Sequence, residues 1–235
     1  MPTTSSPTSA KPSTAASTWA VAAWAGVAFV LIVLGFAGTS GGAGVDEDIL
    51  YDYGFAFGSL IVYGILVGVT LAIAALLGEP LPAVGIKRFA WRWIWIALGL
   101  ILLVLGLASA LEPVLHAGEE QGFQPDTWQP DRAGAFALNA VVAATVVPFG
   151  EELFFRGLGV RVLLPFGALT AVVVTALAFG LGHGLFSALP VLVPFALALG
   201  WVRLRSDSVW PGVIAHGFYN GTALLFLYLD LTNRV

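Results

Sequence analysis

Three charged side chains lie within six positions of an apolar stretch, Gly150–Gly157 (GEELFFRG). They are Glu151, Glu152 and Arg156. A charged side chain at the centre of a membrane helix costs about 2.5–3.5 kcal/mol on insertion scales, so three without compensation would cost about 8–10 kcal/mol. Ionisable groups at this depth are usually paired and functional, and carboxylates suit proton transfer. We therefore expect the chemistry of this protein to start here.

The spacing separates the roles of the two glutamates. Glu152 and Arg156 are four residues apart, so they share a helix face and can form an ion pair. Glu151 lies about 100° around the helix and cannot share that pair equally. Pro148 removes a backbone hydrogen bond just before the pair and should loosen the helix there, together with Gly150. The Glu152–Arg156 pair also fits a purely structural clamp, whereas Glu151 is the carboxylate left for chemistry.

Two further apolar segments carry polar side chains at helical spacing. Phe179 and His183 are four residues apart in a string with alternating glycines (FGLGHG), which should let another helix approach closely. His216 and Asn220 are also four residues apart, so both should point into one space. Each of these alone fits a hydrogen bond between helices. Together with Glu151 they predict a converging set of one carboxylate, two imidazoles and one amide.

The elements that position these groups are membrane helices. The chain of 235 residues is 58% hydrophobic and only 10% charged, and it contains several apolar runs of about 18 residues or more. This composition excludes a soluble domain, and the absence of cysteine excludes disulfides, thiol catalysis and Cys-ligated zinc. The predicted fold is all-α, a polytopic transmembrane bundle of about seven spans. These spans cover approximately Trp19–Ala37, Gly54–Leu77, Trp93–Leu111, Gly134–Leu164, Phe166–Phe186, Leu189–Leu204 and Val209–Leu229.

Composition and charge divide the chain into three parts. Residues 1–18 are rich in Ser, Thr, Pro and Ala and predict a disordered tail. Residues 19–111 predict three N-terminal spans, and residues 134–229 predict the core that carries the polar motifs, its first helix interrupted at Pro148 and Gly150 and ended by Pro165. With seven spans and a cytosolic N-terminus, eight of the ten Lys and Arg residues face the cytosol. We therefore expect a multi-pass protein of the inner (plasma) membrane with a cytoplasmic N-terminus.

The three polar motifs resemble those of a known family. Their order and spacing are similar to the motifs of the CPBP family, the intramembrane proteases that include the type II CaaX prenyl endopeptidases and the bacterial Abi proteins of bacteriocin processing or self-immunity. The resemblance covers about residues 134–225. The matching strings are Glu151-Glu152-x-x-x-Arg156, Phe179-x-x-x-His183 and His216-x-x-x-Asn220.

This resemblance implies hydrolysis of a peptide bond within the bilayer. Glu151 would act with His183 to activate a water molecule as a general base. His216 and Asn220 would hold the carbonyl oxygen as negative charge develops on it. Three supporting residues, which would position Glu151 and shape the pocket, are Glu152, Arg156 and Phe179.

The resemblance also sets expectations for cofactors and partners. We favour a mechanism that needs no cofactor, but a metal-dependent one stays open, in which zinc is ligated by Glu151, His183 and His216 with water in the fourth position. The expected partners are the lipid bilayer and a membrane peptide or protein, either prenylated or of the bacteriocin type, and no nucleic acid.

Two other classes of function fit the same residues. The first is a non-catalytic membrane scaffold or immunity protein that binds a membrane peptide; it could collapse the polar residues into direct pairs without a cavity. The second is a transporter with a proton relay, which should show paired halves with helices broken at corresponding positions. No such internal symmetry is visible in the sequence.

Overall fold

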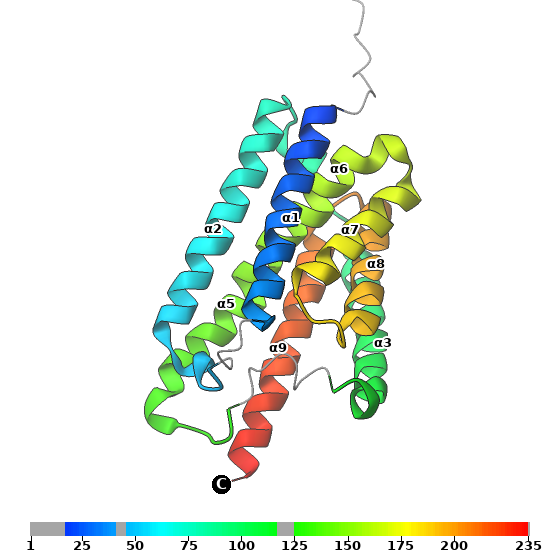
Figure 1. The fold of residues 1–235 in the computed structure, drawn as a ribbon. Helices are drawn as coiled ribbons and strands as arrows, with labels where there is room; N and C mark the ends of the chain where they lie inside the picture. Colours follow the sequence, from blue (N-terminus) through cyan, green and yellow to red (C-terminus); the bar gives the residue numbers. More distant parts are fainter. Residues whose placement is uncertain (1–16, 41–45, 117–124, 235) are drawn as a thin grey trace, which may run out of the picture.

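The computed structural model describes residues 17–40, 46–116 and 125–234, so the predicted disordered tail lies outside the described residues except for its last two positions. Every regular element in these residues is helical, which confirms the prediction of an all-α polytopic bundle (Figure 1). The short 3-10 turns are η1 Ile49–Tyr51, η2 Leu81–Val84, η3 Pro130–Arg132 and η5 Leu164–Phe166, and a π-helical segment, η4, spans Glu152–Gly159. The α-helices are α1 Thr18–Ser40, α2 Tyr53–Leu76, α3 Arg92–Leu115, α5 Ala133–Glu151, α6 Val160–Leu163, α7 Ala168–Gly182, α8 Leu189–Ser206 and α9 Trp210–Asn233.

Six helical units of the described chain are long and apolar enough to cross a membrane: α1, α2, α3, the unit from η3 to η5, α8 and α9. A 24-residue helix such as α2 is about 36 Å long, against about 30 Å for the hydrocarbon core. The predicted fifth span, 166–186, is shorter than expected, because α7 has only 15 residues, or about 22 Å. Gly167 (φ 108°) delays its start, and the chain turns at Gly184 (φ 69°) soon after its end.

Successive spans alternate in direction, so α1 begins at one end of the bundle and α9 finishes at the other (Figure 1). Within the bundle α5 packs between α2 and α9, α7 packs between α1 and α8, and α3 packs on α8 and α9. The α2–α3 connector and the α8–α9 turn lie at the end where α1 begins, which we call the basic end. Its cationic residues in the described chain are Lys87, Arg88, Arg92, Arg161, Arg203 and Arg205.

Pro148 does not interrupt its helix, contrary to the prediction. α5 continues through it to Glu151, and the irregular part follows as the π segment. Pro148 still has no N–H to offer the carbonyl of Ala144. That oxygen lies against Gly217 of α9, where any Cβ would be 2.3 Å from it. The carbonyl that lacks its usual donor thus lies where α5 and α9 approach closely, and these are the helices that carry Glu151 and His216.

The π segment is enclosed by its neighbours, and all eight of its residues are buried. Two glycines make this enclosure possible. A Cβ at Gly157 would lie 2.8 Å from the carbonyl oxygen of Val84, and a Cβ at Gly159 would lie 2.7 Å from Nε1 of Trp24 in α1. Single π-helical turns within helices are frequent at functional sites. Here the segment carries Glu152, so its burial removes that carboxylate from bulk water.

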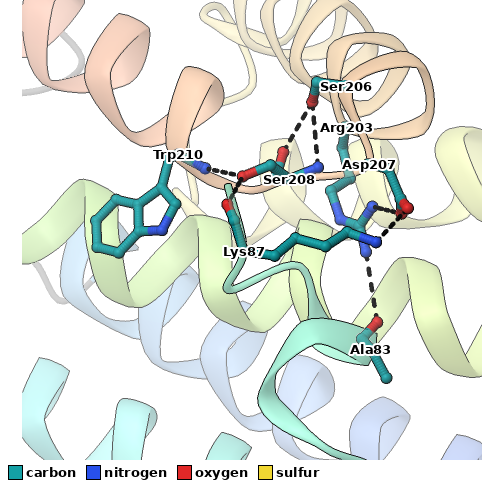
Figure 2. A network of polar contacts seen from close by, with 7 residues as sticks. All are labelled: Ala83, Lys87, Arg203, Ser206, Asp207, Ser208 and Trp210. Atoms are coloured by element: carbon teal, nitrogen blue, oxygen red, sulfur yellow. Dashed lines mark hydrogen bonds and ion pairs between the residues drawn. The ribbon is translucent and has the colours of Figure 1, made fainter. Parts of the chain in front are cut away.

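A polar network holds the α2–α3 connector against the α8–α9 turn (Figure 2). Asp207, in left-handed backbone (φ 57°) after α8, accepts hydrogen bonds from Lys87 and from Arg203, the latter at 3.1 Å. Ser208 Oγ donates to the Lys87 carbonyl at 2.9 Å. Burial raises the pKa of Asp207, but the hydrogen bonds from Lys87 and Arg203 outweigh it, and the pKa is lowered overall. Because the same connector contacts the π segment, the network helps to keep that segment covered.

Candidate active site

The predicted catalytic residues line one cavity of about 630 Å³. Its walls come from η1, α2, α5 and α9, and His183 at the end of α7 completes the lining. The structure therefore brings Glu151, His183, His216 and Asn220 to a single space. The cavity extends from them along α5 and α9 and is mainly apolar there. The apolar residues of this extension include Leu50, Phe55, Val142, Val147, Leu224 and Leu227.

Glu151 is the carboxylate that faces this cavity. Its Oε1 accepts a hydrogen bond from the Tyr63 hydroxyl at 2.8 Å. Its Oε2 is buried without a hydrogen-bond partner in the described residues and lies 3.6 Å from Nε2 of His216. A buried polar atom without a partner is costly unless water or a ligand satisfies it. The Oε2 atom is therefore the acceptor of Glu151 that is left for a water molecule or a ligand.

Glu152 and Arg156 form a fully buried ion pair, as their four-residue spacing predicts. Both side chains are 0% exposed, and Nη1 of Arg156 lies 2.9 Å from Oε1 of Glu152. The guanidinium carbon is 4.4 Å from the centre of the Phe179 ring, and Nη2 donates to the Ala196 carbonyl at 3.4 Å. Oε1 of Glu152 is also 3.2 Å from Nδ1 of His216. The pair thus joins the π segment to α7, α8 and α9.

The two imidazoles are oriented by different partners. Nδ1 of His183 lies 2.9 Å from the Phe179 carbonyl. Because a carbonyl can only accept, Nδ1 carries the proton, and Nε2 of the neutral ring is an acceptor. His216 instead lies between two carboxylates, with Nδ1 toward Glu152 and Nε2 toward Glu151. The site therefore contains two different imidazoles. His183 has an acceptor nitrogen available, whereas His216 is held between Glu151 and Glu152.

Close backbone contacts with α1 hold the turn that carries His183. A Cβ at Gly35 would lie 2.2 Å from the carbonyl oxygen of Gly182, and a Cβ at Gly184 would lie 2.4 Å from the carbonyl oxygen of Gly35. Gly184 also needs its positive φ of 69°, which other residues rarely adopt. Of the predicted glycine-lined surface around His183, α1 thus uses Gly184, whereas Gly180 packs against α8 and a Cβ at Gly182 would meet nothing within 4 Å.

Asn220 binds across to α5. Its Nδ2 donates to the carbonyl of Ala143 at 2.9 Å, next to the carbonyl that Pro148 leaves without its helical partner. A primary amide carries two hydrogens on nitrogen, so one more can be donated by Asn220 toward the cavity that it lines.

Tyr63 belongs to none of the three motifs and is not among the residues predicted from the sequence. The signal that could have identified it is a hydroxyl in the middle of an apolar span, because a buried tyrosine usually needs a hydrogen-bond partner. Asn139 was also missed, but its amide donates to the carbonyls of Leu50 and Asp52, at 3.0 and 2.9 Å. Asn139 therefore attaches η1 to α5, whereas Tyr63 contacts the predicted base directly.

The residues named for the zinc alternative do not fit a metal ion in this arrangement. In the described part of the chain, no three His, Cys, Asp or Glu side chains are grouped so that they could hold one. The hydrogen bonds of His183 Nδ1 to the Phe179 carbonyl and of Tyr63 to Glu151 Oε1 leave Nε2 of His183 and Oε2 of Glu151 as open acceptors, which are the two atoms that the favoured mechanism uses. The geometry thus matches proton transfer by side chains better than a preformed zinc site.

We expect metal chelation to leave peptide cleavage intact, because Glu151 and His183 can together orient and deprotonate a water molecule. The measurement is cleavage of a membrane-borne peptide by the purified protein before and after EDTA treatment, with and without added Zn²⁺. Loss of cleavage with EDTA and its recovery with Zn²⁺ would contradict this expectation.

Comparison with protein families matches residues 133–222 to the type II CAAX prenyl endopeptidase Rce1-like family. No curated protein and no solved structure matches the chain. The matched segment begins with α5 and ends within α9, and it contains all the motif residues, whereas α1, α2 and α3 lie outside it. Residues 133–222 therefore match the Rce1-like family of proteases, which confirms the predicted resemblance to the CPBP family over this part of the chain.

Proposed function

We propose that this protein is an intramembrane endopeptidase that hydrolyses a peptide bond of a membrane-associated substrate with water activated by Glu151 and His183. The observation that supports this best is the composition of the cavity. It combines a carboxylate with one oxygen that has no hydrogen-bond partner among the described residues, an imidazole with an available acceptor nitrogen and two further groups that can donate hydrogen bonds. A scaffold made of the same residues would pair them directly and would not need a cavity of about 630 Å³.

In the proposed reaction, a water molecule donates one hydrogen to Oε2 of Glu151 and the other to Nε2 of His183 as hydrogen bonds. Glu151 takes the first proton while the water oxygen bonds to the substrate carbonyl carbon. Negative charge then develops on the carbonyl oxygen, where a protonated Nε2 of His216 and the second amide hydrogen of Asn220 donate to it. The C–N bond breaks as the leaving nitrogen takes the proton from Glu151, which restores the carboxylate.

The Glu152–Arg156 ion pair and Phe179 have a supporting role in this mechanism. Arg156 neutralises Glu152, and Glu152 orients His216 through Nδ1. Phe179 covers the guanidinium with its ring and orients His183 through its carbonyl. These contacts leave Glu151 as the carboxylate available for proton transfer.

We also propose that the basic end faces the cytosol of a cell with an inner (plasma) membrane, which makes the N-terminus cytoplasmic. Arg156, one of the eight Lys and Arg residues counted on the cytosolic side from the sequence, is buried and therefore does not count toward the positive-inside rule. Among the other described residues the bias persists, because six cations belong to the basic end and only Arg132 and Arg234 belong to the other. The apolar extension of the cavity suits a prenylated or bacteriocin-type peptide.

The function can be tested in cells by comparing the peptides of the membrane fraction. Three strains are needed: one that lacks the gene, one that carries Glu151→Gln and one that carries Glu47→Gln, an exposed glutamate in the loop before η1. The uncleaved substrate should accumulate to the same extent in the first two strains and be processed normally in the third. A Glu151→Gln strain with normal processing would contradict the enzyme and favour the scaffold.

A further inference from the structure

We propose that Tyr63 of α2 is a positioning residue, which holds one oxygen of Glu151 so that the other faces the reacting water. This inference rests on the proposed function. It extends the site to a helix outside the segment that matches the protease family, residues 133–222.

The hydrogen bond from Tyr63 gives the two carboxylate oxygens of Glu151 different surroundings. The Tyr63 hydroxyl donates to Oε1 at 2.8 Å, and Oε2 is left without a donor among the described residues. Tyr63 also lines the large cavity and a second one of about 220 Å³ on the side of α1, and Glu151 and His183 border both. The tyrosine thus lies beside the base where the two cavities come together.

The backbone beside Glu151 is shaped to receive the tyrosine ring. A Cβ added to Gly150 would lie 2.9 Å from Cδ1 and 3.6 Å from Cβ of Tyr63. Real Cβ atoms essentially never approach an atom within 3.0 Å, so an alanine there would displace the ring. The glycine that immediately precedes the base therefore leaves the space that the ring occupies, and from this position the hydroxyl reaches Glu151.

The hydrogen bond from Tyr63 matters for catalysis because Glu151 has another possible partner, His216. Nε2 of His216 is 3.6 Å from Oε2, so a small rotation of the carboxylate could close this gap into a direct ion pair. Such a pair would occupy the oxygen that must accept the proton of water and the nitrogen that must stabilise the carbonyl oxygen. Tyr63 is a neutral donor, so it restrains Glu151 without neutralising it.

The test is the variant Tyr63→Phe, which keeps the ring and removes the donor. We expect kcat for a membrane-borne peptide to fall about 10–100-fold with little change in KM or melting temperature, because a hydrogen bond to a charged group is lost. The matched control is Tyr53→Phe on the same helix. Tyr53 places its hydroxyl beside Gly134 of α5, far from Glu151, and this variant should keep the wild-type kcat.

Two further variants separate positioning from structural support. Gly150→Ala should lower kcat in the same way, and combining it with Tyr63→Phe should give much less than the product of the single effects, because both act through one hydrogen bond. In a Glu151→Gln background, Tyr63→Phe should have almost no further effect on the residual rate.

The possible results distinguish this inference from the proposed function. A wild-type kcat for Tyr63→Phe, while Glu151→Gln is inactive, would overturn the role of Tyr63 and leave the endopeptidase in place. A fall in melting temperature with a raised KM and an unchanged kcat would also overturn it, because the role would then be structural. An active Glu151→Gln protein would instead refute the proposed function itself.

Discussion

Glu151→Gln is expected to lower kcat/KM for a membrane-borne peptide by about 10²–10⁴-fold, the usual contribution of a general base. The glutamine amide keeps the size of the side chain, and its oxygen can still accept from Tyr63. It cannot take a proton from water at neutral pH. The loss should therefore appear in turnover while the protein still inserts and folds.

The measurement is single-turnover cleavage in proteoliposomes, with the melting temperature of each variant as the check on folding. His183→Ala should cause a comparable loss, because it removes the acceptor nitrogen beside the same water. Glu47→Gln makes the same chemical change on an exposed loop and should behave like the wild type. Unchanged turnover in purified Glu151→Gln protein would refute the assignment of the base.

Glu152→Gln is expected to destabilise the fold by about 3–5 kcal/mol, the usual cost of removing one partner of a buried ion pair. The substitution leaves the guanidinium of Arg156 charged and 0% exposed, beside the Phe155 and Phe179 rings and the Ala196 carbonyl but without its partner carboxylate. Reversible unfolding in mixed detergent micelles would measure the loss. The matched control is Asp230→Asn, because Asp230 pairs with Arg234 at the same four-residue spacing on an exposed surface, where such pairs contribute about 0.3–0.5 kcal/mol.

A double variant separates the structural role of this pair from its role at the site. Replacing both partners, as in Glu152→Gln with Arg156→Met, should recover much of the lost stability, because no unpaired charge stays buried. Cleavage should remain low, because His216 no longer has a carboxylate at Nδ1. Equal stabilities for Glu152→Gln and Asp230→Asn would contradict the expected contribution of the buried Glu152–Arg156 pair to stability. Full activity of the double variant would show that this pair has only a structural role.

Much of this site could be predicted from residue spacing because the relevant geometry lies within single helices. A four-residue separation puts Glu152 beside Arg156 in the structure and Phe179 beside His183, whatever the rest of the fold does. The lengths of the apolar runs likewise predict an all-helical membrane bundle, because a span needs a minimum number of residues. Glycine at 180 and 184 likewise indicates close packing of another helix without naming the partner.

The tertiary structure decided the contacts between helices, which the periodicity within a single helix cannot predict. Three close contacts join segments that are far apart in the chain. They are those of α1 with Gly184, of Gly217 with the Ala144 carbonyl and of Tyr63 with Gly150. These contacts bring α9 against α5 beside Pro148, and they place Tyr63, outside every motif, against the base.

The sequence by itself thus determined that these side chains exist at helical spacing inside membrane spans. Only the packing of one helix on another decided which of them share a cavity, because side chains from distant segments meet only where the backbones fit together.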